Sequence, residues 1–218
     1  MAPDHTEIHS RQAIGLDRVL IAQNGNPAQA LLINTKTNDV EKTFTIPVAS
    51  PDNVHGQLRR VHLTGEGTLL VAQMDGDKVV EYDGAGNVLW SVAVASPWDA
   101  VRLNNGNTLI SSNKGFVREV NSTGEAVWEV TGSDLPGYVL RNVQEVTRIS
   151  NGNTLISNWV AGAYKPADWP KTVQFFEVTP DKKIVWALSS WQNPDLGPAT
   201  SIQLLDQPGI AENGDLQR

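Results

Sequence analysis

The chain has 218 residues, a formal net charge of −7 and no cysteine. The acidic balance and the absence of a basic run argue against nucleic-acid binding, and the lack of cysteine excludes disulfides, thiol chemistry and cysteine-ligated zinc. No segment reaches the roughly 20 apolar residues of a membrane-spanning helix and no signal peptide precedes the first repeat, so we expect no membrane insertion.

Two nearly identical segments organise the chain. Residues 103–111 read LNNGNTLIS and residues 149–157 read ISNGNTLIS. In each copy the Asn-Gly pair is typical of a tight hairpin turn that needs positive φ, and the Thr-Leu-Ile that follows favours a strand. The two copies therefore predict a repeat protein built from β-hairpins.

Short apolar segments separated by turn residues continue this pattern along the chain. In chain order they are residues 19–23, 30–34, 42–46, 69–73, 78–82, 88–92, 108–111, 116–120, 126–130, 154–157, 173–178 and 184–188. A further strand is expected before each glycine turn, as at residues 58–63 and 100–103. Four short antiparallel strands in about 40–50 residues match the period of a propeller blade, and no segment has helical periodicity. The sequence therefore predicts an all-β fold, a single β-propeller domain over residues 1–218.

Four blades are predicted, at residues 8–48, 57–94, 97–131 and 140–190, with one extra strand at residues 199–206. The extra strand either completes the first blade or belongs to a larger ring of which this chain is a fragment. An open arc would leave sheet edges exposed. The sequence leaves both alternatives open.

One large aromatic residue aligns on the fourth strand of each blade. These residues are Phe44, Trp90, Trp128 and Trp186. A large flat side chain at this place most simply packs one blade against the next. We therefore expect the three tryptophans to be largely buried.

The turn-and-tryptophan repeats resemble those of a known group of propellers. Residues 119–128 (EVNSTGEAVW), 81–90 (EYDGAGNVLW) and 177–186 (EVTPDKKIVW) resemble the docking-tryptophan repeat of pyrroloquinoline-quinone-type, or quinoprotein-like, propellers. The Asn-Gly-Asn-Thr-Leu-Ile turns are similar to those of arylsulfotransferase-type propellers. The resemblance covers about residues 8–206 and implies a bacterial propeller exported to the periplasm or the cell exterior. It also implies six to eight blades, so that this chain would be a truncated piece.

The predicted ligand site lies on the face of the blades that carries the longer loops, where function is most often built. The repeat alignment places Arg59, Asp99 and Glu145 at equivalent starts of inner strands, as a mixed-charge ring facing the channel; His9 and Thr200 align with them. The insertion at residues 158–171 adds aromatic side chains. The predicted ligand-binding residues are Arg59, Trp98, Asp99, Glu145, Trp159, Tyr164 and Trp169. Aromatic rings stack on sugars and the charged groups bind hydroxyls or carboxylates. In the alternative interpretation, the polar residues satisfy one another and the aromatic residues pack locally.

Motifs for common catalytic chemistry are missing. The four histidines, at positions 5, 9, 55 and 62, have no metal-ligand spacing, and no calcium loop, G-x-S-x-G elbow or P-loop is present. We therefore expect no metal and no cofactor, the quinone included. His55 and Arg59 are the catalytic candidates, because an imidazole beside a guanidinium could perform acid–base chemistry on an acidic sugar.

The sequence supports three hypotheses for function. The leading one is an exported binding or scaffold module that recognises a carbohydrate or another polymer on its loop-rich face. The first alternative is an enzyme, a polysaccharide lyase or hydrolase that acts on an acidic glycan. The second alternative is a platform for protein–protein assembly. The fold by itself does not choose among them.

Overall fold

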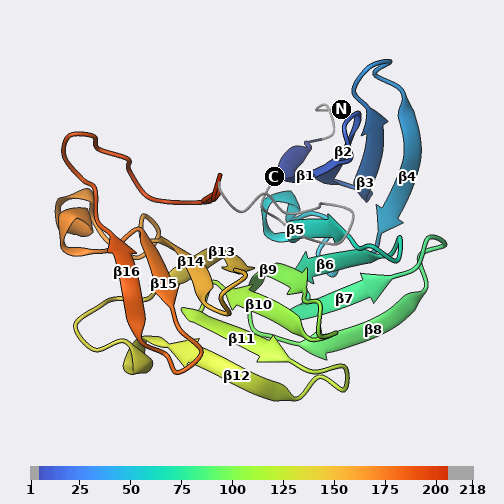
Figure 1. Cartoon of the computed structure of the whole chain (residues 1–218). Helices are drawn as coiled ribbons and strands as arrows, with labels where there is room; N and C mark the ends of the chain where they lie inside the picture. Colours follow the sequence, from blue (N-terminus) through green and yellow to red (C-terminus); the bar gives the residue numbers. More distant parts are fainter. Residues whose placement is uncertain (1–4, 206–218) are drawn as a thin grey trace. The chain divides into compact units, whose positions relative to one another are not determined.

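The computed structural model describes residues 5–205, which form 16 strands in four four-stranded antiparallel sheets (Figure 1). The all-β propeller fold with four-stranded blades is confirmed. The three helices among these residues are short 3-10 helices, the longest of six residues. No helix in residues 5–205 is long and apolar enough to cross a membrane. The chain divides after Arg102 into two compact units.

The first unit contains nine strands, and each of its two complete sheets is a meander of consecutive strands. Its first sheet consists of β1 (Glu7–Ile14), β2 (Arg18–Asn24), β3 (Ala28–Asn34) and β4 (Val40–Ile46). After helix η1 (Val54–Gly56), its second sheet consists of β5 (Leu58–Leu63), β6 (Leu69–Gln73), β7 (Lys78–Tyr82) and β8 (Val88–Ala93). The last strand of the unit is β9 (Pro97–Arg102), the inner strand of the third blade.

The second unit holds the rest of the third blade and the whole fourth blade. Its strands are β10 (Thr108–Ser112), β11 (Phe116–Val120), β12 (Ala126–Thr131), β13 (Asn142–Arg148), β14 (Thr154–Trp159), β15 (Phe175–Val178) and β16 (Ile184–Leu188). Helix η2 (Gly132–Asp134) follows β12, and helix η3 (Pro166–Lys171) lies between β14 and β15. The observed blades therefore begin and end within a few residues of the predicted ranges.

No strand forms at residues 199–205, contrary to the extra strand predicted at residues 199–206. Asp206 lies outside the described residues. The backbone N–H of Ile202 donates to the Glu145 carboxylate at 3.1 Å, so a side chain takes the bond that a neighbouring strand would otherwise accept. A short apolar run predicts a strand only where another strand is available to pair with it.

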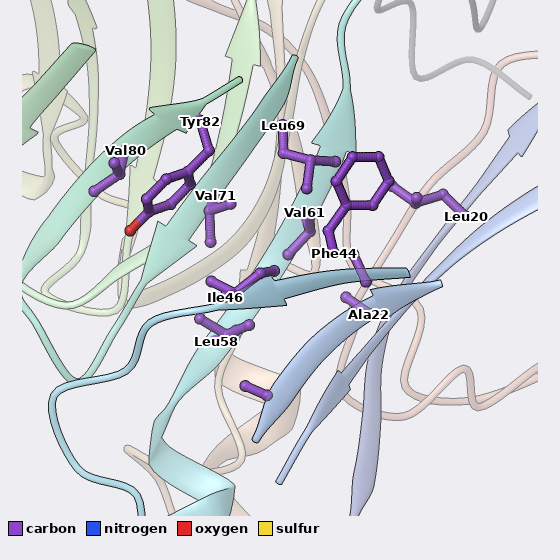
Figure 2. Close-up of a cluster of buried hydrophobic side chains, with 12 residues drawn as sticks. Leu20, Ala22, Phe44, Ile46, Leu58, Val61, Leu69, Val71, Val80 and Tyr82 are labelled. Carbon is purple, nitrogen blue, oxygen red and sulfur yellow. The ribbon is translucent and has the colours of Figure 1, made fainter. Parts of the chain in front are cut away.

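The core of the first unit lies between its two complete blades. Figure 2 shows Phe44 and Ile46 of β4 beside Leu58 and Val61 of β5, with Leu69 of β6 in the same cluster. All five side chains are buried. At about 25 cal/mol per Å² of apolar surface removed from water, such a cluster is the main term that holds one blade on the next.

The core of the second unit has the same plan. Leu109 and Val117 of the third blade pack with Val146 and Ile156 of the fourth, around the fully buried ring of Phe176. The Tyr138 ring meets the Phe176 ring edge-on, with centroids 5.6 Å apart. The loop between β12 and β13 is thereby fixed on the core.

The two Asn-Gly turns form as hairpins, and only the glycines have positive φ, +84° at Gly106 and +86° at Gly152. The asparagine before each glycine keeps negative φ, and its side-chain oxygen accepts a hydrogen bond from the backbone of the turn. Asn105 accepts from the N–H of Asn107 at 3.0 Å, and Asn151 accepts from the N–H of Asn153 at 2.9 Å. The three-residue loop with a left-handed glycine is the common alternative to a two-residue turn.

We expect Gly106→Val and Gly152→Val to destabilise the protein by about 1 kcal/mol or more each, because a β-branched residue is strained at positive φ. A Cβ at Gly106 meets no atom within 4 Å, so the cost there comes from the backbone conformation alone. Denaturant midpoints of the two variants and of wild type measure it. Unchanged midpoints would contradict the role assigned to these glycines.

In the first unit, an arginine joins the second blade to the inner strand of the third. Arg102, at the end of β9, donates to the carboxylate of Glu81 and lies 5.0 Å from the centre of the Trp90 ring. Glu81 and Trp90 are cross-strand partners on β7 and β8. Trp90 is half-buried because the guanidinium covers its face, which replaces part of the hydrophobic packing that we expected.

The second unit repeats this contact. Arg148, at the end of β13, donates to Glu119 at 2.9 Å and lies 5.3 Å from the centre of the Trp128 ring. Asn107 of the repeated turn also donates to Glu119, at 2.6 Å. Burial acts to raise the pKa of Glu119, but Asn107 and Arg148 outweigh it and hold that pKa below its usual value. Asn107, the residue that follows the glycine of the turn, therefore fixes this glutamate.

Two expectations about the aromatic row were wrong. Trp186 is 39% exposed, because no arginine among the described residues lies over its ring or pairs with Glu177. Phe44 does not occupy the position of the tryptophans, because its cross-strand partner is Ala30. In the first blade Lys42 occupies that position, next to the bulge between the third and fourth strands. The alignment failed in the first blade because Phe44 lies two residues beyond the equivalent position.

Candidate functional site

Three histidines surround one glutamate at the start of β1. The Oε2 atom of Glu7 lies 2.7 Å from His9 Nε2 and 2.8 Å from His55 Nδ1, and its Oε1 atom lies 2.8 Å from His5 Nε2. The rings of His9 and His55 meet edge-on, with centroids 5.3 Å apart. We call Glu7, His9 and His55 the histidine cluster. His55 is 72% exposed at its side chain, whereas His9 is largely covered.

The contacts of the histidine cluster change the ionisation of its members. Hydrogen bonds from His9, His5 and His55 lower the pKa of Glu7 to about 2. Burial lowers the pKa of His9, and the nearby guanidinium of Arg59 acts in the same direction. The cluster therefore holds an ionised carboxylate, with its most buried imidazole biased toward the neutral form.

We expect the stability contributed by Glu7 to be fully present above pH 4.5, its ordinary value, and to be lost as the pH falls toward about 2. The sign follows because the unfolded state binds the proton more readily than the folded state. Glu7→Gln removes this term. The stability difference between wild type and Glu7→Gln, measured by denaturation between pH 2 and 5, should shrink on acidification. A constant difference would contradict the assignment.

Arg59, one of the two catalytic candidates, is only 3% exposed. Its Nη1 atom donates to the backbone carbonyls of His55 and Leu58, and lies 3.5 Å from His9 Nδ1. Its guanidinium lies 4.6 Å from the centre of the half-buried Trp98 ring. Burial lowers the pKa of Arg59. These contacts give Arg59 a positioning role: it fixes the backbone that carries His55.

The predicted ring of Arg59, Asp99 and Glu145 is out of register. The three glycine turns begin at Thr64, Leu103 and Ile149. Asp99 and Glu145 each lie four residues before the start of their turn, and the residue at that place in the second blade is Arg60. A shift by one residue moves a side chain to the other face of its strand. Asp99 is fully buried and bonds His62 Nε2 at 2.8 Å, which places it inside the first unit's packing.

The insertion at residues 158–171 carries a compact group of aromatic side chains. The Trp169 ring lies beside that of Trp191, with centroids 6.0 Å apart and planes tilted by 36°. Both are half-buried, as is Tyr164, so each keeps part of its surface in solvent. Arg141 donates to the Tyr164 hydroxyl at 3.2 Å and lies over its ring. We call Tyr164, Trp169 and Trp191 the aromatic platform.

Local hydrogen bonds fix the orientation of the platform. The indole N–H of Trp169 donates to the Tyr164 carbonyl at 3.1 Å, and that of Trp191 donates to the Thr172 carbonyl at 3.1 Å. Trp159 is separate: a Cβ at Gly162 would lie 2.6 Å from its ring, so the ring packs against the insertion's own backbone. Sequence reasoning therefore identified Tyr164 and Trp169 in the platform but missed Trp191, which is distant in sequence.

A buried asparagine closes the base of the insertion. Asn158 is fully buried; it accepts from the N–H of Arg141 at 2.8 Å and donates to the carbonyls of Val139 and Val173 at 2.8 and 2.7 Å. Its side chain thus ties together the loop before β13 and the segment before β15. The platform rests on this support.

The meander blades define this chain as a β-propeller. The solved structure of a protein of unknown function from Bacteroides caccae matches 88% of this chain and 70% of its own length, with 25% identity and a TM-score of 0.74. Virginiamycin B lyase from Staphylococcus aureus matches 92% of this chain and 61% of its own, with 13% identity and a TM-score of 0.62. A streptogramin B lyase matches 83% of this chain and 57% of its own length, with 12% identity and a TM-score of 0.57.

These comparisons agree with the predicted bacterial β-propeller. This chain spans less than two thirds of the length of the two lyases, and at their identities the likeness shows the fold alone. No protein-family profile matches the chain, and no curated protein matches it. The resemblance to quinoprotein-like and arylsulfotransferase-type repeats stays a prediction.

Proposed function

We propose that this β-propeller is a binding module that recognises a carbohydrate polymer on the aromatic platform. The observation that carries the proposal is the Trp169–Trp191 pair: two half-buried rings with planes tilted by 36°, one on the insertion and the other after β16, both outside the repeated strands. Sugar rings present C–H faces that stack on indoles, and two adjacent indoles suit successive sugar units.

The fixed orientation of the rings favours binding. Each indole N–H is bonded to a backbone carbonyl, so little rotamer freedom is lost when a ligand docks. Arg141 lies exposed beside Tyr164 and supplies a positive charge next to the platform. A guanidinium pairs well with a carboxylate, so we propose glycans that contain uronic acids as the preferred class. Export from the cytoplasm, which the repeat resemblance implies, belongs to the same proposal.

We expect Trp169→Ala and Trp191→Ala each to weaken glycan binding about fivefold or more, since each stacked ring contributes ~1 kcal/mol. Isothermal titration calorimetry against acidic and neutral glycans measures the effect, and thermal melts confirm that the variants fold. Trp186→Ala is the matched control, because that indole is also exposed but lies on β16, outside the platform. Binding that survives both platform variants, or that the control abolishes equally, would contradict the proposal.

One observation favours an enzyme as the second candidate. Glu7 binds Nδ1 of the exposed His55, an arrangement that orients an imidazole for proton abstraction by its other nitrogen. A lyase acting on uronic-acid polymers would produce an unsaturated product that absorbs in the ultraviolet. Turnover by wild type that is lost in His55→Ala would establish the enzyme. If wild type shows no turnover, the binding module is the function that the structure supports.

A further inference from the structure

We propose that the histidine cluster is a binding site for a divalent first-row transition metal such as Zn²⁺. The donor atoms of Glu7, His9 and His55 all lie within 4.8 Å of one another. Among residues 5–205, this is the one such group of three or more acidic, histidine or cysteine side chains. The proposal is independent of glycan binding by the platform, which lies in the other unit.

The spacing of the donors suits a small ion. Zn²⁺ binds imidazole nitrogen and carboxylate oxygen at about 2.0–2.2 Å, which places tetrahedral donors about 3.3 Å apart. The Oε2 atom of Glu7 lies 2.7 Å from His9 Nε2 and 2.8 Å from His55 Nδ1. A shift of roughly half an ångström by each donor would widen both Glu7 distances to this spacing.

The backbone around the cluster holds the three side chains in place. Glu7 and His9 are two residues apart on β1, and their side chains meet at 2.7 Å. The pairing of β1 with β2 is irregular between Ile8 and Ser10, as is common beside functional sites. His55 lies in η1, and its carbonyl accepts from the buried guanidinium of Arg59.

The donor set and its exposure define the class of metal. Two imidazoles and one carboxylate suit Zn²⁺, Ni²⁺, Co²⁺ or Cu²⁺ better than Mg²⁺ or Ca²⁺, which prefer oxygen alone. Because His55 faces solvent, further positions on the ion would be open to water or to a ligand. His5 bonds the other oxygen of Glu7 and lies outside the group of donors within 4.8 Å of one another, so it would have to move to become a fourth ligand.

The nearby charge limits the affinity. The guanidinium of Arg59 lies 3.5 Å from the outer nitrogen of His9, and its positive charge opposes that of the ion. When Nε2 binds the metal, the proton of His9 must sit on Nδ1, and that N–H then faces the N–H of Arg59 Nη1, which also opposes binding. We therefore expect dissociation constants on the order of micromolar rather than nanomolar.

The test is a calorimetric titration of the full chain with ZnCl2, after treatment with a chelator. We expect one ion per chain, with binding weakened at least tenfold in His55→Ala and in His9→Ala. Because His55 is exposed, its variant should fold as the wild type does, and a thermal melt checks this. His62→Gln is the control histidine: His62 lies outside the cluster, and the glutamine amide keeps a donor for the buried Asp99.

Substitution with Co²⁺ supplies a second readout. A visible absorption band typical of nitrogen and oxygen ligands should appear in wild type and in His62→Gln and should be lost in His55→Ala. The proposal is overturned if wild type binds no stoichiometric ion, or if His55→Ala binds Zn²⁺ as tightly as wild type. The His5→Ala variant then decides whether the site has three protein ligands or four: a further loss of affinity assigns the fourth to His5.

Discussion

Asn158→Ala should destabilise the protein by about 3 kcal/mol or more. The substitution leaves one backbone N–H and two backbone carbonyls, all part-buried, without their partner, at about 1 kcal/mol or more each. For a chain of this size that corresponds to a fall in melting temperature of roughly 6–12 °C. Chemical and thermal denaturation measure the loss, with the signal of the platform tryptophans reporting on the insertion.

Asn151→Ala is the matched control for this prediction. Asn151 lies in the same unit, but it is exposed and its oxygen bonds a single backbone N–H in the turn. We expect it to cost about 1 kcal/mol or less. If Asn158→Ala were as mild as the control, the buried amide would not be the support of the insertion. Glycan binding by Asn158→Ala should weaken as well, since the platform rests on the segments that Asn158 ties together.

Asp99→Ala should cost on the order of 3 kcal/mol of stability. It removes the acceptor of His62 Nε2 and of the Ala100 N–H inside the packed first unit. Losing one partner of a buried polar pair leaves the other desolvated and unpaired. Asp99→Asn keeps an acceptor oxygen at the same place and should recover much of the loss. Denaturant midpoints of the two variants provide the measurement.

A double variant separates this role from a ligand-binding one. Asp99→Ala combined with His62→Phe removes both polar groups, so it should cost less than Asp99→Ala alone. If Asp99→Ala were stable and weakened glycan binding instead, the ligand-binding role predicted from sequence would hold for Asp99. We expect the stability effect, because the carboxylate has no exposed surface.

The candidate site was predictable only in part. Tyr164 and Trp169 were identified because aromatic residues on a long insertion depart from the repeat pattern. Trp191 was missed because nothing in its own sequence surroundings relates it to Trp169. The histidine cluster was missed for the same reason: Glu7 and His9 lie on β1 but His55 lies on η1, and metal-ligand motifs are recognised only at close spacing.

The amino-acid sequence by itself determined the propeller blades. Hairpin turns and strand alternation are local properties, so the Asn-Gly repeats and the apolar runs specify four-stranded meanders wherever they occur. The positions of Arg60, Asp99 and Glu145 follow from the sequence, since each precedes the glycine of its turn by seven residues. The pairing of the inner strands was decided by tertiary structure, because β5 and β13 each carry one extra residue opposite the next strand, and such a bulge leaves no mark in the composition. Burial was likewise decided there: Trp128 is covered by Arg148, whereas Trp186, at the same place in its repeat, has no described arginine over it. Which side chain meets which partner across a distance in the chain depends on packing, and packing is a property of the folded molecule.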